Sequence, residues 1–274
     1  MDNRAVGVFD SGLGGLTAVR VLRKLLPNER IVFLGDTGRM PYGSRDKDTL
    51  RMFADDDFRF LLSKDVKYIL IACGTISSNI GNLHIESVPV PVTGVIEPTA
   101  TAAVSASSNH RIGVIATEAC IRSGAYQESV KKLDPSVEVT AVPCPKLVPL
   151  IEAFSPDRYR EELFPTVSEY LEPIKQNHCD TLILGCTHYP LISDVISECL
   201  GPDVALVDSG AEAAAVTVND LKTRNMCSSG TTIQEPAFYV TADPDRFSHS
   251  ASFFLGEDIS KAHLVNIQKR KNEE

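Results

Sequence analysis

The chain has 274 residues, a formal net charge of −9 and 43% apolar residues, which is enough for one large or two medium domains with real cores. The acidic balance argues against direct binding to nucleic acid, and no apolar run approaches the roughly 18 residues of a membrane span. The N-terminus lacks a signal-peptide pattern, so we expect a globular cytoplasmic protein.

Apolar strand-like runs alternate with amphipathic helical patterns, which predicts parallel βαβ units covered by helices on both faces. The strand candidates are Ala5–Phe9, Ile31–Leu34, Tyr68–Ala72, Val92–Val95, Arg111–Ile115, Val137–Val142, Thr181–Leu184 and Val204–Val207. Helical periodicity is clearest over Leu16–Leu26, Asp46–Ser63 and Pro156–Lys175. The two halves look like a degenerate duplication, and we expect the tail, Lys269–Glu274, to be frayed and solvated.

Two loops follow the first two strands. Asp10–Gly15 has glycines that allow a tight turn, and the helix start behind it offers N–H groups to a carboxylate or phosphate. The G-x-G-G spacing disfavours a dinucleotide loop, so we favour a small-carboxylate site, with a plain strand–helix turn as the alternative. Asp36–Gly43 carries polar groups at the same edge, but the sequence also fits a simple Pro/Gly turn.

Two of the seven cysteines, Cys73 and Cys186, end strand-like runs, and each is followed within two residues by threonine. Ligands bind at the carboxyl ends of strands in open α/β sheets, so the matching positions indicate two thiols facing one substrate. His188 is a candidate proton partner for Cys186. Either thiol alone would more often be a buried core residue, and we interpret the other five cysteines as packing.

The odd, scattered cysteines indicate reduced thiols rather than a disulfide framework. A zinc site from His178, Cys179, Cys186 and His188 is the alternative. The residues between them read as one buried strand, whereas structural zinc sites favour ligands on tight turns, so we expect no metal. Glu152 ends an apolar segment and could be solvated or turned into a cleft, and spacing does not decide between these.

The chain resembles the glutamate racemases, within the cofactor-independent amino-acid racemases, in four motifs that stand in the same order: Asp10–Gly15, Pro41–Gly43, Cys73–Thr75 and Cys186–Leu191. The resemblance implies an α/β fold of two pseudo-symmetric domains, each a mostly parallel sheet flanked by helices, with the active site in the interdomain cleft. One domain would hold residues 1–96 plus 209–274, and the other residues 97–208.

The resemblance also implies interconversion of L- and D-glutamate without a cofactor, supplying D-glutamate for bacterial peptidoglycan, by a cytoplasmic homodimer with no membrane or nucleic-acid partner. Cys73 and Cys186 would be the two proton carriers, with Asp10 near the first and with His188 and Glu152 near the second. The substrate-binding residues that the resemblance implies are Asp10, Ser11, Pro41, Tyr42, Gly43, Gly74, Thr75, Thr117, Thr187 and His188.

Chemistry agrees with that implication, because a racemase needs two acid–base groups in opposite protonation states, one on each face of the substrate carbon. The α-proton of an amino acid is weakly acidic, so the developing carbanion needs stabilising donors nearby. We expect a helix to begin after each cysteine strand, so that its N-terminal field supplies part of that stabilisation.

Two positions depart from the family pattern. Gly74 stands where the family normally has asparagine, and losing one buried polar contact would cost about 1–3 kcal/mol. Cys120 stands where relatives commonly carry threonine. An aspartate or other amino-acid racemase therefore stays an alternative, as does a low-activity binding or regulatory homologue. A decarboxylase with a single catalytic cysteine fits poorly because both cysteines are present.

Overall fold

The computed structural model describes residues 1–81, 85–153, 159–256, 258–259 and 261–268. The predicted start of the third helix at Pro156 and the tail from Lys269 lie outside the described residues. No helix in the described ranges is long and apolar enough to cross a membrane.

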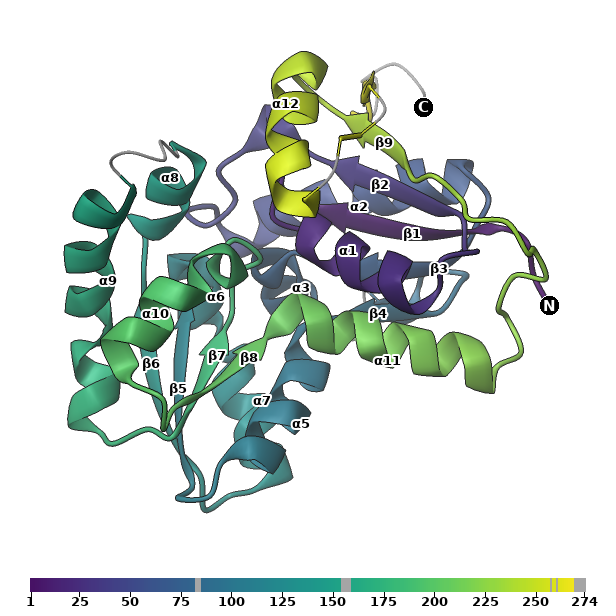
Figure 1. The fold of residues 1–274 in the computed structure, drawn as a ribbon. Coiled ribbons are helices and arrows are strands. Elements are labelled where there is room, and N and C mark those ends of the chain that lie inside the picture. Colours follow the sequence, from purple (N-terminus) through teal and green to yellow (C-terminus); the bar gives the residue numbers. More distant parts are fainter. Residues whose placement is uncertain (82–84, 154–158, 257, 260, 269–274) are drawn as a thin grey trace.

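Six parallel strands form the first sheet, in the order β10-β9-β2-β1-β3-β4. Their bounds are β1 (Ala5–Asp10), β2 (Ile31–Gly35), β3 (Val66–Ile71), β4 (Val92–Gly94), β9 (Ala237–Val240) and β10 (His263–Leu264). Val8 in the central strand pairs with Phe33 on one side and Leu70 on the other. The last two strands bring the C-terminal part of the chain back to the N-terminal sheet (Figure 1).

Four parallel strands form the second sheet, in the order β6-β5-β7-β8. Their bounds are β5 (Arg111–Ala116), β6 (Glu138–Pro143), β7 (Thr181–Leu184) and β8 (Ala205–Asp208). This order repeats the order β2-β1-β3-β4 of the first sheet, with β5 in the place of β1 and β7 in the place of β3. The two sheets therefore confirm the predicted fold of two pseudo-symmetric α/β units.

Helices connect the strands and cover both sheets. Their bounds are α1 (Leu16–Leu25), α2 (Lys47–Ser63), α3 (Gly74–Ile80), α5 (Ile96–Ala106), α6 (Glu118–Ser123), α7 (Ala125–Leu133), α8 (Leu147–Glu152), α9 (Tyr159–Gln176), α10 (Ser193–Leu200), α11 (Ser209–Thr223) and α12 (Pro244–Leu255), with 3-10 helices η1 (Thr37–Arg39) and η2 (Tyr189–Ile192). Asp46 caps α2 by accepting a hydrogen bond from the Thr49 amide, which fixes where that helix begins.

Successive side chains along the strands of the second sheet point to opposite faces, and each face packs into a different apolar core. Val114 and Ile183 pack on the side of α5 and α7, whereas Leu182 and Leu184 pack on the side of α9 and α10. Figure 1 shows these two helix pairs on opposite sides of the second sheet. The first of these cores continues through α1 and α11 to β1, so one apolar core joins both sheets.

All eight predicted strands are confirmed to within two residues at each end, and so are the first two predicted helices. Strands β9 and β10 have no counterpart in the sequence prediction, because they are short and are defined by pairing with β2 and with each other. The division of the chain after residue 96 and after residue 208 stays a prediction, which the membership of the two sheets supports.

Candidate active site

A cavity of about 440 Å³ lies where the carboxyl ends of the two sheets meet. Its walls come from the segments that follow β1, β2 and β3 in the first sheet and β5, β6 and β7 in the second. All the sequence-predicted site residues except Asp10 line it: Ser11, Pro41, Tyr42, Gly43, Cys73, Gly74, Thr75, Thr117, Glu152, Cys186, Thr187 and His188. The cavity is thus the cleft between the two units.

On the first side of the cavity, Cys73 lies between the end of β3 and the start of α3. Its sulfur lies 3.8 Å from the Ser11 hydroxyl, and the residue is 4% exposed. Burial, and next the nearby carboxylate of Asp10, raise the pKa of the Cys73 thiol well above its ordinary value. These surroundings favour the protonated thiol at Cys73.

On the second side, Cys186 follows β7, and its sulfur lies 3.8 Å from Nδ1 of His188. The other ring nitrogen of His188, Nε2, lies 3.0 Å from a carboxylate oxygen of Glu152, which ends α8. Burial lowers the pKa of His188, but the hydrogen bonds to Cys186 and Glu152 outweigh burial and raise it to about 10. A positively charged imidazolium therefore faces the Cys186 sulfur.

The chain after Cys186 differs from the prediction. A helix does begin directly after Cys73, but Cys186 is followed by η2, a 3-10 helix of 4 residues, before α10 begins. Tight 3-10 turns are used in short pieces and have poorer hydrogen-bond geometry than α-helices. The positive field at Cys186 therefore comes from His188 rather than from an α-helix N-terminus.

Asp10 is buried behind the cavity instead of lining it. One of its carboxylate oxygens accepts a hydrogen bond from the Gly12 amide at 3.0 Å, and the other accepts one from the Thr187 hydroxyl at 3.4 Å. Burial raises the pKa of Asp10, while the charge of His188 opposes that shift. Asp10 therefore links the first strand end to the Cys186 segment across the cleft.

The glycine turn after β1 also differs from the prediction. The amides of Leu16 and Thr17, in the first turn of α1, donate to the carbonyls of Leu13 and Gly14, so they are not available to a ligand. Gly14 instead packs against Thr187 and His188. Of this segment, Ser11 lines the cavity, and the binding of a small carboxylate by this turn stays a prediction.

A buried charge cluster lies behind the Pro41–Gly43 loop. Arg39 donates to Asp36, to Asp56 at 2.7 Å and to Asp57 at 3.3 Å, and the Tyr42 hydroxyl also donates to Asp36. The Tyr42 hydroxyl is thus directed to Asp36, and the role of this residue in holding substrate stays a prediction. The loop can offer backbone groups and the body of the ring to a ligand.

The fully buried Asp57 belongs to the same cluster. Burial raises its pKa well above the ordinary value, and repulsion from Asp36 adds to the effect. One carboxylate oxygen of Asp57 has no hydrogen-bond partner among the described residues. A neutral, protonated carboxyl at this position is consistent with three acids surrounding one guanidinium.

The sequence patterns did not indicate two features of the site. Cys144, interpreted from the sequence as packing, lines the cavity directly after β6, and its strand-end position was the available signal. The ring of Phe254 in α12 meets the His188 ring edge-on, with centroids 5.8 Å apart, and no local pattern indicates this long-range contact. Cys120 does not line the cavity, and its amide donates to the Thr117 hydroxyl at 3.3 Å.

The cavity holds polar donors but, among its described lining residues, neither lysine nor arginine. The hydroxyls of Ser11, Ser44, Thr75, Thr117 and Thr187 and the His188 ring are side chains that could receive an anionic ligand. Thr75 and Thr117 also bond each other across the cleft at 2.9 Å. The arrangement suits a small amino acid held between two sulfur atoms that could exchange protons with it from two sides.

No group of three or more potential metal ligands occurs within the described ranges. The four residues considered for zinc separate into two pairs, with His178 and Cys179 before β7 and Cys186 and His188 after it. A strand of 4 residues thus holds the pairs apart, which disagrees with a shared tetrahedral site.

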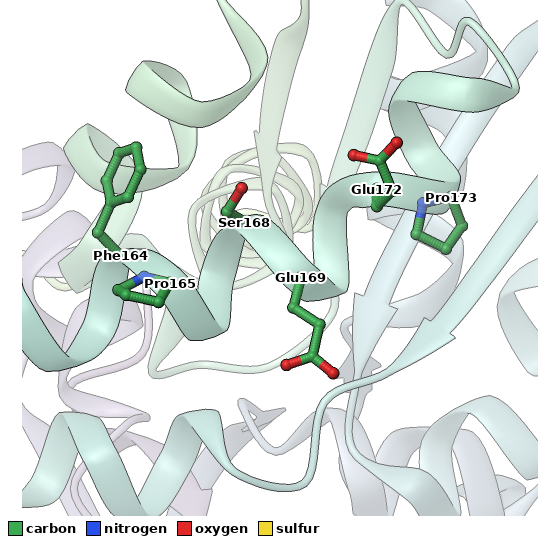
Figure 2. Close-up of a pocket in the computed structure, with 6 residues that line it drawn as sticks. All are labelled: Phe164, Pro165, Ser168, Glu169, Glu172 and Pro173. Atoms are coloured by element: carbon green, nitrogen blue, oxygen red, sulfur yellow. The ribbon is translucent and has the colours of Figure 1, made fainter.

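A second hollow lies along the outer face of α9 (Figure 2). Its walls come from one helix: Phe164, Pro165, Ser168, Glu169, Glu172 and Pro173. Two glutamates and one serine on a single helix face provide no convergent set of groups like that around Cys73 and Cys186. We therefore assign the chemistry to the cavity between the sheets.

Comparison with known proteins points to one family. The sequence profile of the Asp/Glu/Hydantoin racemase family matches residues 19–217. The glutamate racemase of Streptococcus equi subsp. equi is 40% identical over 270 residues, covering 97% of this chain and 100% of that protein.

Among solved structures, an isoform of glutamate racemase from Bacillus anthracis superposes with a TM-score of 0.92 at 32% identity, covering 97% of this chain and 98% of the other. Glutamate racemase from Francisella tularensis, solved in complex with D-glutamate, gives 0.90 at 36% identity, covering 97% and 99%.

The hydrogen bonds of His188 predict a ring that stays charged at neutral pH. In ¹⁵N NMR of histidine-labelled protein, we expect His188 to be doubly protonated at pH 8, because its pKa is raised to about 10. The stabilisation from the charged ring should be complete below pH 6.5 and lost as the pH rises through about 10. Glu152→Gln removes a negative partner and should lower the titration midpoint by about one to three pH units. A wild-type midpoint near 6.5 would contradict this assignment.

The raised pKa of Asp57 predicts a pH-dependent effect of Asp57→Asn. Stability associated with a raised carboxyl pKa is present below the ordinary value of 3.8 and is lost as the pH rises toward the folded-state value. The neutral variant avoids this loss, so its unfolding free energy should increase relative to wild type between pH 5 and pH 8. Urea denaturation at both pH values measures the difference, with Asp245→Asn, at an exposed ion pair, as control. A difference that does not change with pH would argue for an ionised Asp57.

Proposed function

This chain belongs to the Asp/Glu/Hydantoin racemase family, and from that membership we propose that it interconverts L- and D-glutamate. The proposal draws on relatives named glutamate racemase that match nearly the whole chain, and on a similar structure solved in complex with D-glutamate. Both chains in each comparison are covered almost completely, so the likeness includes both halves of the cleft.

One observation carries the mechanism that we propose, namely the equivalent positions of Cys73 and Cys186. Cys73 follows β3, and Cys186 follows β7, which takes the place of β3 in the second sheet. Both cysteines line the same cavity from different units. A substrate carbon between two such sulfurs can lose its proton to one and gain a proton from the other.

In the proposed reaction, one cysteine is a thiolate that takes the α-proton, and the other is a thiol that donates its proton to the opposite face. The C–H bond breaks as an S–H bond forms on one side, and the reverse occurs on the other, so no oxidant or reductant is needed. The unlike surroundings of the two sulfurs support this division, because imidazolium His188 faces Cys186 and the carboxylate Asp10 lies near Cys73. Reversing the two protonation states reverses the direction of reaction.

The remaining site residues have supporting roles in this proposal. Glu152 holds the His188 ring through Nε2, and Asp10 holds Thr187 and the Gly12 amide. The hydroxyls that line the cavity would bind the carboxylates and the ammonium group of the substrate. We also propose that the D-glutamate formed is used for bacterial peptidoglycan.

Circular dichroism of the purified protein tests the substrate. With L-glutamate or with D-glutamate and no added cofactor, the signal should decay to zero from either side, because enantiomers have equal free energies in an achiral solvent. Decay with the two aspartate enantiomers but not with glutamate would make the chain an aspartate racemase instead. No decay with any of the four would favour a binding or regulatory protein.

Single substitutions test the two proton carriers. Cys73→Ser and Cys186→Ser should each lower racemisation by about 10³-fold or more, because a hydroxyl is a far weaker acid and base than a thiol. The one-way exchange of the α-proton with deuterated solvent should be lost for one enantiomer in each variant. Cys227→Ser, at a partly exposed cysteine outside the cavity, is the matched control and should keep full activity. Full racemisation by either active-site variant would falsify the two-base mechanism.

A further inference from the structure

Gly74 directly follows Cys73 and is the first residue of α3. A Cβ atom added at this position would lie well inside 3.0 Å of the carbonyl oxygen of Gly185, a separation that real Cβ atoms essentially never show. Gly185 directly precedes Cys186. The residue after one cysteine thus meets the backbone of the residue before the other, so the two cysteine segments are in contact without an intervening side chain.

Backbone hydrogen bonds and close packing hold both segments in place at this contact. The Gly185 amide donates to the Ile115 carbonyl at 2.8 Å, and its α-carbon is packed so closely that an added Cβ would lie 2.9 Å from the ring of Tyr126. On the other side, the Cys73 carbonyl accepts from the Ser77 amide at 2.9 Å within the first turn of α3. The obstructing atom is backbone rather than the end of a flexible side chain. A side chain at position 74 would therefore have to move the two units apart.

Two further glycines of the first unit meet the second unit around the same cavity. An added Cβ at Gly14 would lie 2.7 Å from Nδ1 of His188, and one at Gly43 would lie 3.0 Å from Cβ of Thr117. The Gly43 carbonyl also accepts a hydrogen bond from the Ala119 amide at 2.9 Å. Glycine backbone of the first unit thus contacts the second unit at several points around the cavity. Gly74 makes the contact that lies next to both cysteines, because it follows Cys73 and meets the residue before Cys186.

We propose that Gly74 is a positioning residue, whose lack of a side chain lets the Cys73 and Cys186 segments of this chain lie in direct contact across the cavity and so sets the separation of the two thiols. This inference rests on the proposed function in so far as the two thiols act on one substrate. It also gives a different interpretation of Gly74, which stands where the family's Cys-Asn-Thr pattern has asparagine. In this chain the Gly185 carbonyl oxygen lies too close to position 74 to leave room for the Cβ atom that an asparagine would need.

Two substitutions, Gly74→Ala and Gly74→Asn, test the proposal without reference to any substrate. Cys73 is 4% exposed and Cys186 7% exposed, so both thiols should react slowly with iodoacetamide in the wild type. Moving the units apart should expose both, and we expect each variant to be alkylated at both positions at least about tenfold faster. Mass spectrometry of the peptides gives each rate separately. The rate at Cys227 in the same sample should be unchanged, which shows that the variant is folded.

Racemisation kinetics provide the second readout. Separation of the two thiols by even about 1 Å should lower kcat by about 100-fold in Gly74→Ala, with a smaller change in KM. Gly74→Asn should be no more active than Gly74→Ala. Gly230→Ala, an exposed glycine outside the cavity, controls for adding a methyl group and should match wild type in both readouts.

The outcomes separate this inference from the proposed function. Unchanged alkylation at both cysteines would overturn the positioning role of Gly74, and so would a Gly74→Asn variant with higher kcat/KM than wild type. Faster alkylation in the variants, together with a wild type that does not racemise glutamate, would support the role of Gly74 in closure and reject glutamate as the substrate.

Discussion

A parallel strand carries its functional loop at its carboxyl end, so two parallel sheets can build one site only if those ends are held face to face. In this protein a single apolar core imposes that arrangement. The core runs from β1 through α1 and α11 to α5 and β5, and it therefore belongs to both sheets. Because close-packed interiors resist deformation, this shared core fixes the relative position of Cys73 and Cys186 more firmly than a flexible linker could.

The two cysteine thiols that line the cavity are chemically identical, but their surroundings differ. One sulfur lies in a buried environment near the carboxylate of Asp10, and the other faces the ring of His188, which Glu152 keeps charged. Electrostatic effects are stronger away from water, so a few buried charges suffice to distinguish the two thiols. The Thr187 hydroxyl joins the two sides by donating to Asp10 across the cleft.

Elements distant from the cleft hold its walls in place. The Arg39 cluster fixes the loop at Pro41–Gly43, and Thr241, which follows β9, also donates to Asp36 at 2.7 Å. Phe254 in α12 packs on His188. The C-terminal part of the chain thus supports both the Pro41–Gly43 loop and the Cys186 side of the cavity.

Hydrophobic patterning by itself determined much of this protein. Alternating apolar strands and helices predicted the α/β class, and the strand-end positions of Cys73 and Cys186 predicted one site shared by two units, because local periodicity and strand direction are properties of short segments. Glu152 shows where that reasoning ends, since spacing left it open and only the fold brings it to His188. Only the fold shows that the Tyr42 hydroxyl donates to Asp36. Only the fold shows that Gly74 lies against the carbonyl of Gly185, far along the chain. Glu152 and Gly74 required the tertiary structure because each meets a residue that is distant in the sequence, and packing of the shared core decides which distant segments meet. Tyr42 required it because the folded shape of its own loop decides which acceptor its hydroxyl reaches.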